Sequence, residues 1–362
     1  MTNRIGNKLK GRRALPVLIL LLAVLFLLIR LAALAQAGDS STGAGDSVNS
    51  GGDGAGGFSE GGSSGRSSTA DNTDPGAALT APAGNQSPGE IIDTGQHLNR
   101  RQMEEALAMA KEDRWAIHLK DGAEGGRIRC LTLPHHLPAA GLTIHALEEL
   151  AGRQEKPGVI ILMGPNHQNI GPAAAVTSAG WQTAYGRVEP QKEIIAALLR
   201  EGLAAEAVEC FPQEHSLGMV IPWLAKFLPD TPVVPLLFHY QYPMKDLEKL
   251  LGVLDPWLEE DGLLLISVDF SHHQKADEAA RYDEKTAQLL EKGDWRTLAG
   301  LSSDYLDSPT LVAAMVRYSL DRALTGPAVM AHTNTGRLTG IAGQEVTSYF
   351  VLAYTEKEAE GQ

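Results

Sequence analysis

Residues 158–167 read GVIILMGPNH, a short apolar run that ends in Gly-Pro-Asn-His. An uninterrupted apolar run of this length is typical of a strand that is buried on both faces, as in a parallel sheet covered by helices. Two further strand-like runs also end in polar residues: RIRCLTLPHH at residues 127–136 and GLLLISVDFSHH at residues 262–273. The three segments predict strands of one sheet whose carboxyl ends carry histidine and aspartate.

Between these runs the chain alternates between strand-like and helix-like segments. Further strands are predicted at residues 232–238 and 345–354. Helical spacing of apolar side chains predicts helices at residues 139–153, 193–201, 216–227, 244–258, 276–292 and 309–323. Alternation of this kind is typical of α/β folds. We expect a single three-layer domain with a mainly parallel central sheet flanked by helices.

The N-terminal residues 1–37 have the pattern of an export signal. Five basic residues and no acidic residue precede an uncharged apolar run at 14–29, and Arg30 and small residues follow it. This pattern is typical of a cleaved signal peptide or of an uncleaved signal anchor. The basic residues favour a cytoplasmic N-terminus. Both alternatives predict an extracytoplasmic protein, either secreted after cleavage or tethered to the membrane by one N-terminal helix.

Residues 38–92 separate this segment from the rest of the chain. Residues 38–69 contain 11 Gly and 9 Ser among 32 residues, so they carry too little apolar surface to offset the entropy cost of ordering. We therefore expect a disordered Gly/Ser-rich linker over residues 38–92. The remaining residues, 93–362, have the length of one large α/β domain.

Composition excludes several classes of protein. The 362 residues include 31 Lys and Arg against 44 Asp and Glu, which gives a formal net charge of −13. An acidic chain lacks the basic surface that binds nucleic acid, so we expect no such partner. Two cysteines, Cys130 and Cys210, cannot build a disulfide scaffold or a cysteine-rich zinc site. Whether they pair stays open, as does the oligomeric state.

The residues that follow the three strand-like runs are candidate metal ligands. His135 and His136 follow the first run, His167 the second, and Asp269 and His272 the third. In α/β sheets, ligands bind outside the carboxyl ends of the strands. Histidine and carboxylate are ligands for iron, copper, nickel and zinc. The pattern therefore predicts a metal site at this edge of the sheet.

Several motifs of the chain resemble the Memo-like family, also called AmmeMemoRadiSam system protein B. They are LPHH at 133–136, GPNH at 164–167, EHSLGMVIPWL at 214–224, SVDFSHH at 267–273, DEKT at 283–286 and LDSP at 306–309. That family is similar in fold to the class III extradiol dioxygenases of the B type, a non-heme-iron group. The resemblance implies an extradiol-dioxygenase-like fold and a metal ion, iron or copper, held by two histidines and a cysteine.

The resemblance places the two metal-binding histidines at His135 and His167. No cysteine occupies the turn at residues 303–309, where the third ligand is expected, and the best available ligand there is Asp307. A set of two histidines and one carboxylate is the facial triad of non-heme iron, although zinc is also possible. An alternative stays open, in which Asp307 caps the helix that follows it.

Three further residues are candidates for proton transfer and substrate positioning. The resemblance places Asp269 and His272 in this role, and His215 lies in the EHS motif just before a predicted helix. Three functions remain open: a metal-dependent oxidoreductase of dioxygenase type, a non-catalytic extracytoplasmic module that binds a ligand or metal, and a metal-dependent hydrolase. The ligand, a small molecule or a peptide, is not identified by the sequence.

Overall fold

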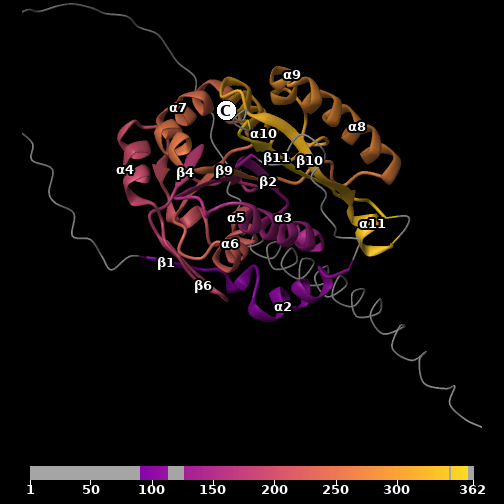
Figure 1. The fold of residues 1–362 in the computed structure, drawn as a ribbon, viewed down its shortest axis with the longest axis horizontal. Coiled ribbons are helices and arrows are strands. Elements are labelled where there is room, and N and C mark those ends of the chain that lie inside the picture. Colours follow the sequence, from indigo (N-terminus) through magenta and orange to yellow (C-terminus); the bar gives the residue numbers. More distant parts are fainter. Residues whose placement is uncertain (1–89, 113–125, 342–343, 358–362) are drawn as a thin grey trace, which may run out of the picture. The chain divides into compact units, whose positions relative to one another are not determined.

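The computed structural model describes residues 90–112, 126–341 and 344–357, and Figure 1 shows their arrangement. The predicted signal segment at 1–37 and the linker up to residue 89 lie outside these residues. The predicted linker ends too late, because Ile91 already begins strand β1 (Ile91–Asp93), which pairs with β5 (Gly180–Thr183).

The expected membrane tether and extracytoplasmic location are corrected by the structure. In the part of the chain that the structure describes, no helix is both long enough and apolar enough to cross a bilayer. The apolar side chains of these helices instead pack into the core of the domain. The predictions of a membrane tether and of an extracytoplasmic location are therefore withdrawn.

A sheet of eight strands forms the centre of the domain, in the order β10-β11-β2-β9-β3-β8-β4-β7. The four strands β2, β9, β3 and β8 run parallel to one another, and antiparallel pairs join β11 to β2, β10 to β11, and β4 to β8. Their bounds are β2 Ile128–Leu133, β3 Ile160–Pro165, β4 Ala174–Val176, β7 Ala205–Glu206, β8 Val233–Phe238, β9 Leu263–Ser267, β10 Thr325–Asn334 and β11 Ser348–Thr355. The predicted mainly parallel sheet is confirmed.

Alternate side chains of the central strands enter two separate apolar cores, one on each face of the sheet. Ile160 and Leu162 belong to the first core, whereas Ile161 and Met163 belong to the second. Helices α2 (Arg100–Met109), α3 (Ala140–Arg153) and α6 (Ile221–Phe227) contribute to the first core. Helices α4 (Lys192–Arg200), α7 (Met244–Glu260), α8 (Ala276–Lys292), α9 (Trp295–Ala299) and α10 (Pro309–Asp321) contribute to the second. The fold is thus the predicted three-layer α/β arrangement.

The sequence patterns do not predict the ten-residue strand β10, the strands β1, β4, β5, β6 (Gly186–Val188) and β7, or helices α2 and α9. Strand β6 joins β1 and β5 in a small second sheet of order β1-β5-β6. The predicted helix at 216–227 is divided into α5 (His215–Gly218) and α6. Pro222 lies in the first turn of α6, where no intrahelical hydrogen bond needs its missing N–H, so the helix is not kinked there.

Candidate metal centre

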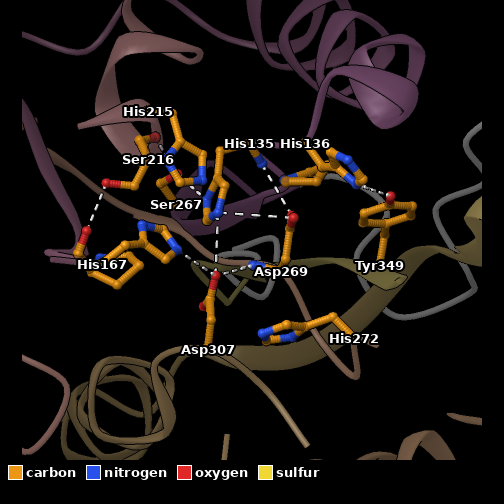
Figure 2. Close-up of polar contacts among 12 residues, drawn as sticks. His135, His136, His167, His215, Ser216, Ser267, Asp269, His272, Asp307 and Tyr349 are labelled. Carbon is orange, nitrogen blue, oxygen red and sulfur yellow. Dashed lines mark hydrogen bonds and ion pairs between the residues drawn. The ribbon is translucent and has the colours of Figure 1, made fainter. Parts of the chain in front are cut away.

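Three histidines from distant parts of the sequence meet at the carboxyl edge of the central sheet (Figure 2). His135 follows β2, His167 follows β3, and His215 is the first residue of α5. One nitrogen of each ring lies within 4.8 Å of the corresponding nitrogens of the other two. Parallel pairing of β2 and β3 with β9 brings the first two loops to the same edge.

Asp307 completes this group from the opposite side. Its Oδ2 atom lies 3.2 Å from His135 Nε2 and 3.7 Å from His167 Nε2. The N-cap residue of α10 is Ser308, and no side-chain hydrogen bond caps that helix end. The capping alternative for Asp307 is therefore wrong, and its carboxylate faces the histidines instead (Figure 2).

Asp269 lies beside the three histidines and holds both His135 and Asp307 in place. Its Oδ1 accepts the backbone N–H of His135 at 3.2 Å, and its Oδ2 lies 3.8 Å from His135 Nε2. The backbone of Asp269 also donates to Asp307 Oδ2 at 3.2 Å and accepts the N–H of Asp307 at 3.1 Å. These contacts fix the direction in which the Asp307 carboxylate points.

A hydrogen-bond chain fixes the ring of His135. Ser267 Oγ donates to the carbonyl of Ser216 at 2.6 Å, so its single proton is already used. The contact of 3.0 Å between Ser267 Oγ and His135 Nδ1 is therefore donated by the imidazole. Nδ1 carries a proton in this arrangement, and Nε2 is the nitrogen available to a metal ion.

Glu214 has the same role for His167. Its Oε1 accepts from His167 Nδ1 at 2.8 Å, and its Oε2 accepts the backbone N–H of the same residue at 2.8 Å. A further bond from the N–H of Ser216 reaches Oε1 at 2.9 Å. These charge-assisted bonds offset the burial of the carboxylate and lower the pKa of Glu214 to about 2. His167 Nε2 is left pointing at Asp307.

Electrostatics differ among the three imidazoles. Burial lowers the pKa of His167, but the nearby carboxylates of Asp307 and Glu214 outweigh it and raise the pKa to about 10. Burial also opposes protonation of His135, but Asp269 and Asp307 raise its pKa overall. Burial and the two neighbouring imidazoles lower the pKa of His215 to about 3. His215 is therefore neutral near pH 7 and has a free lone pair.

His272, the remaining sequence candidate, is not among the residues whose ligand atoms meet, and its expected role in proton transfer stays a prediction. Its Nδ1 contacts the backbone carbonyl of Phe270 at 2.7 Å, a local bond that turns the ring toward its own loop. His136 also turns away, because its Nδ1 contacts the hydroxyl of Tyr349 at 2.7 Å. His215, expected as a proton-transfer residue, lies instead among the potential ligand atoms. Both cysteines are free and buried, and neither is in this group.

Sequence reasoning missed the partner that fixes the ring of His135. Ser267 is the first residue of the SVDFSHH motif, and its position at the last residue of β9, beside the end of β2, is the signal that could have identified it. Tyr349 gave no comparable signal, since it lies within the apolar run of β11.

The donor set fits a transition metal ion on two independent grounds. Three imidazole nitrogens within 4.8 Å of one another match the preference of such ions for nitrogen donors. In addition, Asp307 Oδ1 is buried and has no hydrogen-bond partner among the described residues, although buried polar atoms are normally satisfied. The three histidines could therefore hold a metal ion, with Asp307 beside them.

Comparison with known proteins agrees with the motifs. The profile of the family described as Memo-like protein matches residues 93–349. A "MEMO1 family protein" of Aquifex aeolicus is 30% identical over 206 residues, which cover 55% of this chain and 76% of that protein. Another, from Caldivirga maquilingensis, is 27% identical over 237 residues, which cover 61% of this chain and 81% of that protein.

A solved structure of an uncharacterised Escherichia coli K12 protein has 11% sequence identity and a TM-score of 0.38, covering 63% of this chain and 99% of that chain. A likeness at this level carries no argument. The family profile, in contrast, spans most of the chain and includes all three histidines of this cluster. The chain belongs to the Memo-like family.

Proposed function

We propose that this protein binds one redox-active transition metal ion, iron(II) or copper, between His135, His167, His215 and Asp307. The observation that carries the proposal is the convergence of three imidazoles, with the carboxylate of Asp307 beside them: its Oδ2 lies near two of the rings, and its Oδ1 is buried and has no hydrogen-bond partner among the described residues. Nitrogen-rich sites with one carboxylate suit iron and copper. When bound, such an ion supplies electron transfer and activation of a small ligand.

Two protein carboxylates and one hydroxyl would prepare the site for the ion. Glu214 holds Nδ1 of His167, and Ser267 holds Nδ1 of His135, so that Nε2 of both rings faces the centre. Partners of this kind fix the ring orientation of a metal ligand and raise its basicity. Asp269 positions Asp307 through two backbone contacts and so acts on the ion only indirectly.

The exposure of the histidines indicates the side from which a small ligand would approach. The side chain of His135 is only 3% exposed, whereas those of His167 and His215 are 30% and 44% exposed. The buried side of the site is filled by Asp269, Ser267 and Asp307. An ion held here would keep its open positions on the side of His167 and His215, where substrate or dioxygen would bind.

The proposal is tested by elemental analysis of protein purified without an affinity tag. We expect about one equivalent of iron or copper per chain, and loss of that metal when His135 and His167 are both replaced with alanine. His145→Ala is the matched control, because His145 is a partly buried histidine of α3 outside the group. Metal content that is unchanged in the double variant would reject the site, and one equivalent of zinc would favour a hydrolytic centre over a redox one.

A further inference from the structure

A second cluster of polar side chains is centred on the buried carboxylate of Asp283. Asp283 of α8 is only 3% exposed and belongs to the DEKT motif, which the proposed metal site does not use. Its Oδ1 accepts hydrogen bonds from Ser271 Oγ at 2.8 Å and Ser348 Oγ at 2.6 Å. Its Oδ2 lies 2.9 Å from Nε2 of His332, whose ring stacks on Phe350 at 4.0 Å.

This cluster joins four segments of the chain. Ser271 follows β9, Ser348 begins β11, His332 is in β10, and α8 lies beside β10 in Figure 1. Burying an ionised carboxylate is unfavourable unless it is fully hydrogen-bonded, and apolar side chains of similar size would stabilise a core equally well. Stability alone therefore does not account for a carboxylate at this position.

The two serines connect Asp283 to the loop that contains Asp269. Besides their side-chain contacts, the N–H of Ser348 donates to the carbonyl of Ser271 at 2.6 Å, and the N–H of Phe270 donates to the carbonyl of Ser348 at 3.0 Å. The loop after β9 is thus fastened to β11 by its backbone and by the Asp283 carboxylate together. Asp269, which orients Asp307, immediately precedes Phe270 in this loop.

We propose that Asp283 is a positioning residue of the metal centre, which holds the loop at residues 269–271 against β11 so that Asp307 faces the histidines. The inference rests on the proposed metal-binding function. Asp283 does not touch the ion. It acts through Ser271 and Ser348 on the backbone of Asp269, and Asp269 sets the direction of the Asp307 carboxylate through two hydrogen bonds.

The first test measures metal affinity by competition with a chelator, together with the visible spectrum of the cobalt(II)-loaded protein. We expect Asp283→Ala to lower the affinity about 10- to 100-fold, the range for loss of a residue that orients a ligand, and to change the spectrum. Asp283→Asn keeps an acceptor for the serines and a donor for His332, so it should stay within about threefold of the unmodified protein.

Leu290→Ala is the matched control for loss of stability. Leu290 lies on the same helix, is 1% exposed and makes no polar contact with the loop, so its truncation destabilises the core without altering the site. We expect its cobalt spectrum and affinity to equal those of the unmodified protein. A folded Asp283→Ala protein with unchanged affinity and spectrum would overturn the inference.

The second test does not depend on metal. Amide hydrogen exchange of the metal-free protein reports whether the N–H groups of Asp269, Phe270 and Asp307 stay protected. In Asp283→Ala we expect these N–H groups to exchange at least about tenfold faster than in the unmodified protein. In Leu290→Ala we expect no such local effect, because opening is spread over the helix and its neighbours. If Asp283→Ala fails to fold, Ser348→Ala removes one hydroxyl of the same cluster and should show the same local pattern.

The two tests separate this inference from the proposed function. If the unmodified protein binds no metal, the proposed function fails, but local loss of protection around Asp307 would still support Asp283 as the residue that holds the loop. If the unmodified protein binds metal and the Asp283 and Ser348 variants change neither affinity nor exchange, the inference fails and the metal site stands.

Discussion

Metal binding should displace protons from this site, because carboxylates hold at least one imidazole in its charged form. In the metal-free protein, Asp307 and Glu214 raise the pKa of His167 to about 10 against the opposing effect of burial. Nε2 of His167 then carries a proton near neutral pH and lies 3.7 Å from the carboxylate oxygen Oδ2 of Asp307. A metal ion can use that nitrogen only after the proton has left.

The size of this competition follows from the pKa. One pH unit corresponds to 1.36 kcal/mol, so at pH 7 removal of the proton from His167 costs about 4 kcal/mol, or about a thousandfold in apparent affinity. Metal affinity therefore falls as pH falls, because more His167 is protonated. Between pH 7 and 9 we expect affinity to rise about tenfold per pH unit, and more steeply wherever His135, whose pKa is also raised, loses a proton as well.

Replacement of Asp307 by asparagine tests the origin of the effect. The substitution keeps the shape of the side chain but removes the charge that lies near both His135 and His167, so the pKa of each imidazole should fall. Fewer protons should then be released on binding near pH 7.5. Asp304→Asn, in the same loop but exposed, is the matched control and should behave as the unmodified protein.

Calorimetric titration in buffers of different ionisation enthalpy counts the released protons directly. We expect the unmodified protein and Asp304→Asn to release about one proton or more, and Asp307→Asn to release fewer and to bind less tightly. Binding without proton release in the unmodified protein, or equal release by Asp307→Asn, would refute the electrostatic reasoning.

Three further predictions address individual residues. His215→Ala should lower metal affinity by about tenfold or more while the melting temperature changes little, because this side chain is 44% exposed; unchanged affinity in a chelator competition would exclude His215 as a ligand. Glu214→Gln should lower the pKa of His167 in an NMR titration, and a pKa that stays near 10 would contradict the pairing. Cys130 should resist iodoacetamide in the folded protein, since burial raises its pKa to about 12, and rapid alkylation seen by mass spectrometry would count against its burial.

The central part of the fold could be predicted because the strands that form it are covered on both faces. A strand such as Ile160–Pro165 sends alternate side chains into two cores, so nearly every position must be apolar and the run is visible in the sequence. Short strands leave no such trace. The three-residue strands β1 and β6 and the two-residue β7 are too brief to show a period, and they were not predicted.

The candidate site was predictable where it depends on strand ends and not where it depends on side-chain direction. His135 and His167 follow buried parallel strands, whose ends meet by topology alone. Whether Asp307 capped a helix or faced the site depends on its contacts with Asp269, which the sequence does not contain. The role of His272 in proton transfer stays a prediction, and its contact with the Phe270 carbonyl depends on a loop conformation that the sequence does not contain.

The direction of the His215 side chain also could not be predicted from the sequence. The EHS motif indicated a residue near the pocket, but a continuous helix over 216–227 would have aimed it differently. The helix breaks after Gly218, and Ser216 Oγ donates to the carbonyl of Pro165 at 2.8 Å, which fastens α5 to the end of β3. This tertiary contact brings the third imidazole to the other two.

Anomalous diffraction would locate the proposed metal ion in the protein. Data would be collected at the iron, copper and zinc absorption edges, on crystals of the protein purified without an affinity tag. We expect one anomalous-difference peak, at the iron or copper edge. It should be enclosed by Nε2 of His135, Nε2 of His167, a ring nitrogen of His215 and the carboxylate of Asp307. Crystals that contain metal with the peak elsewhere, or crystals grown with added iron or copper that show no peak between these residues, would contradict it.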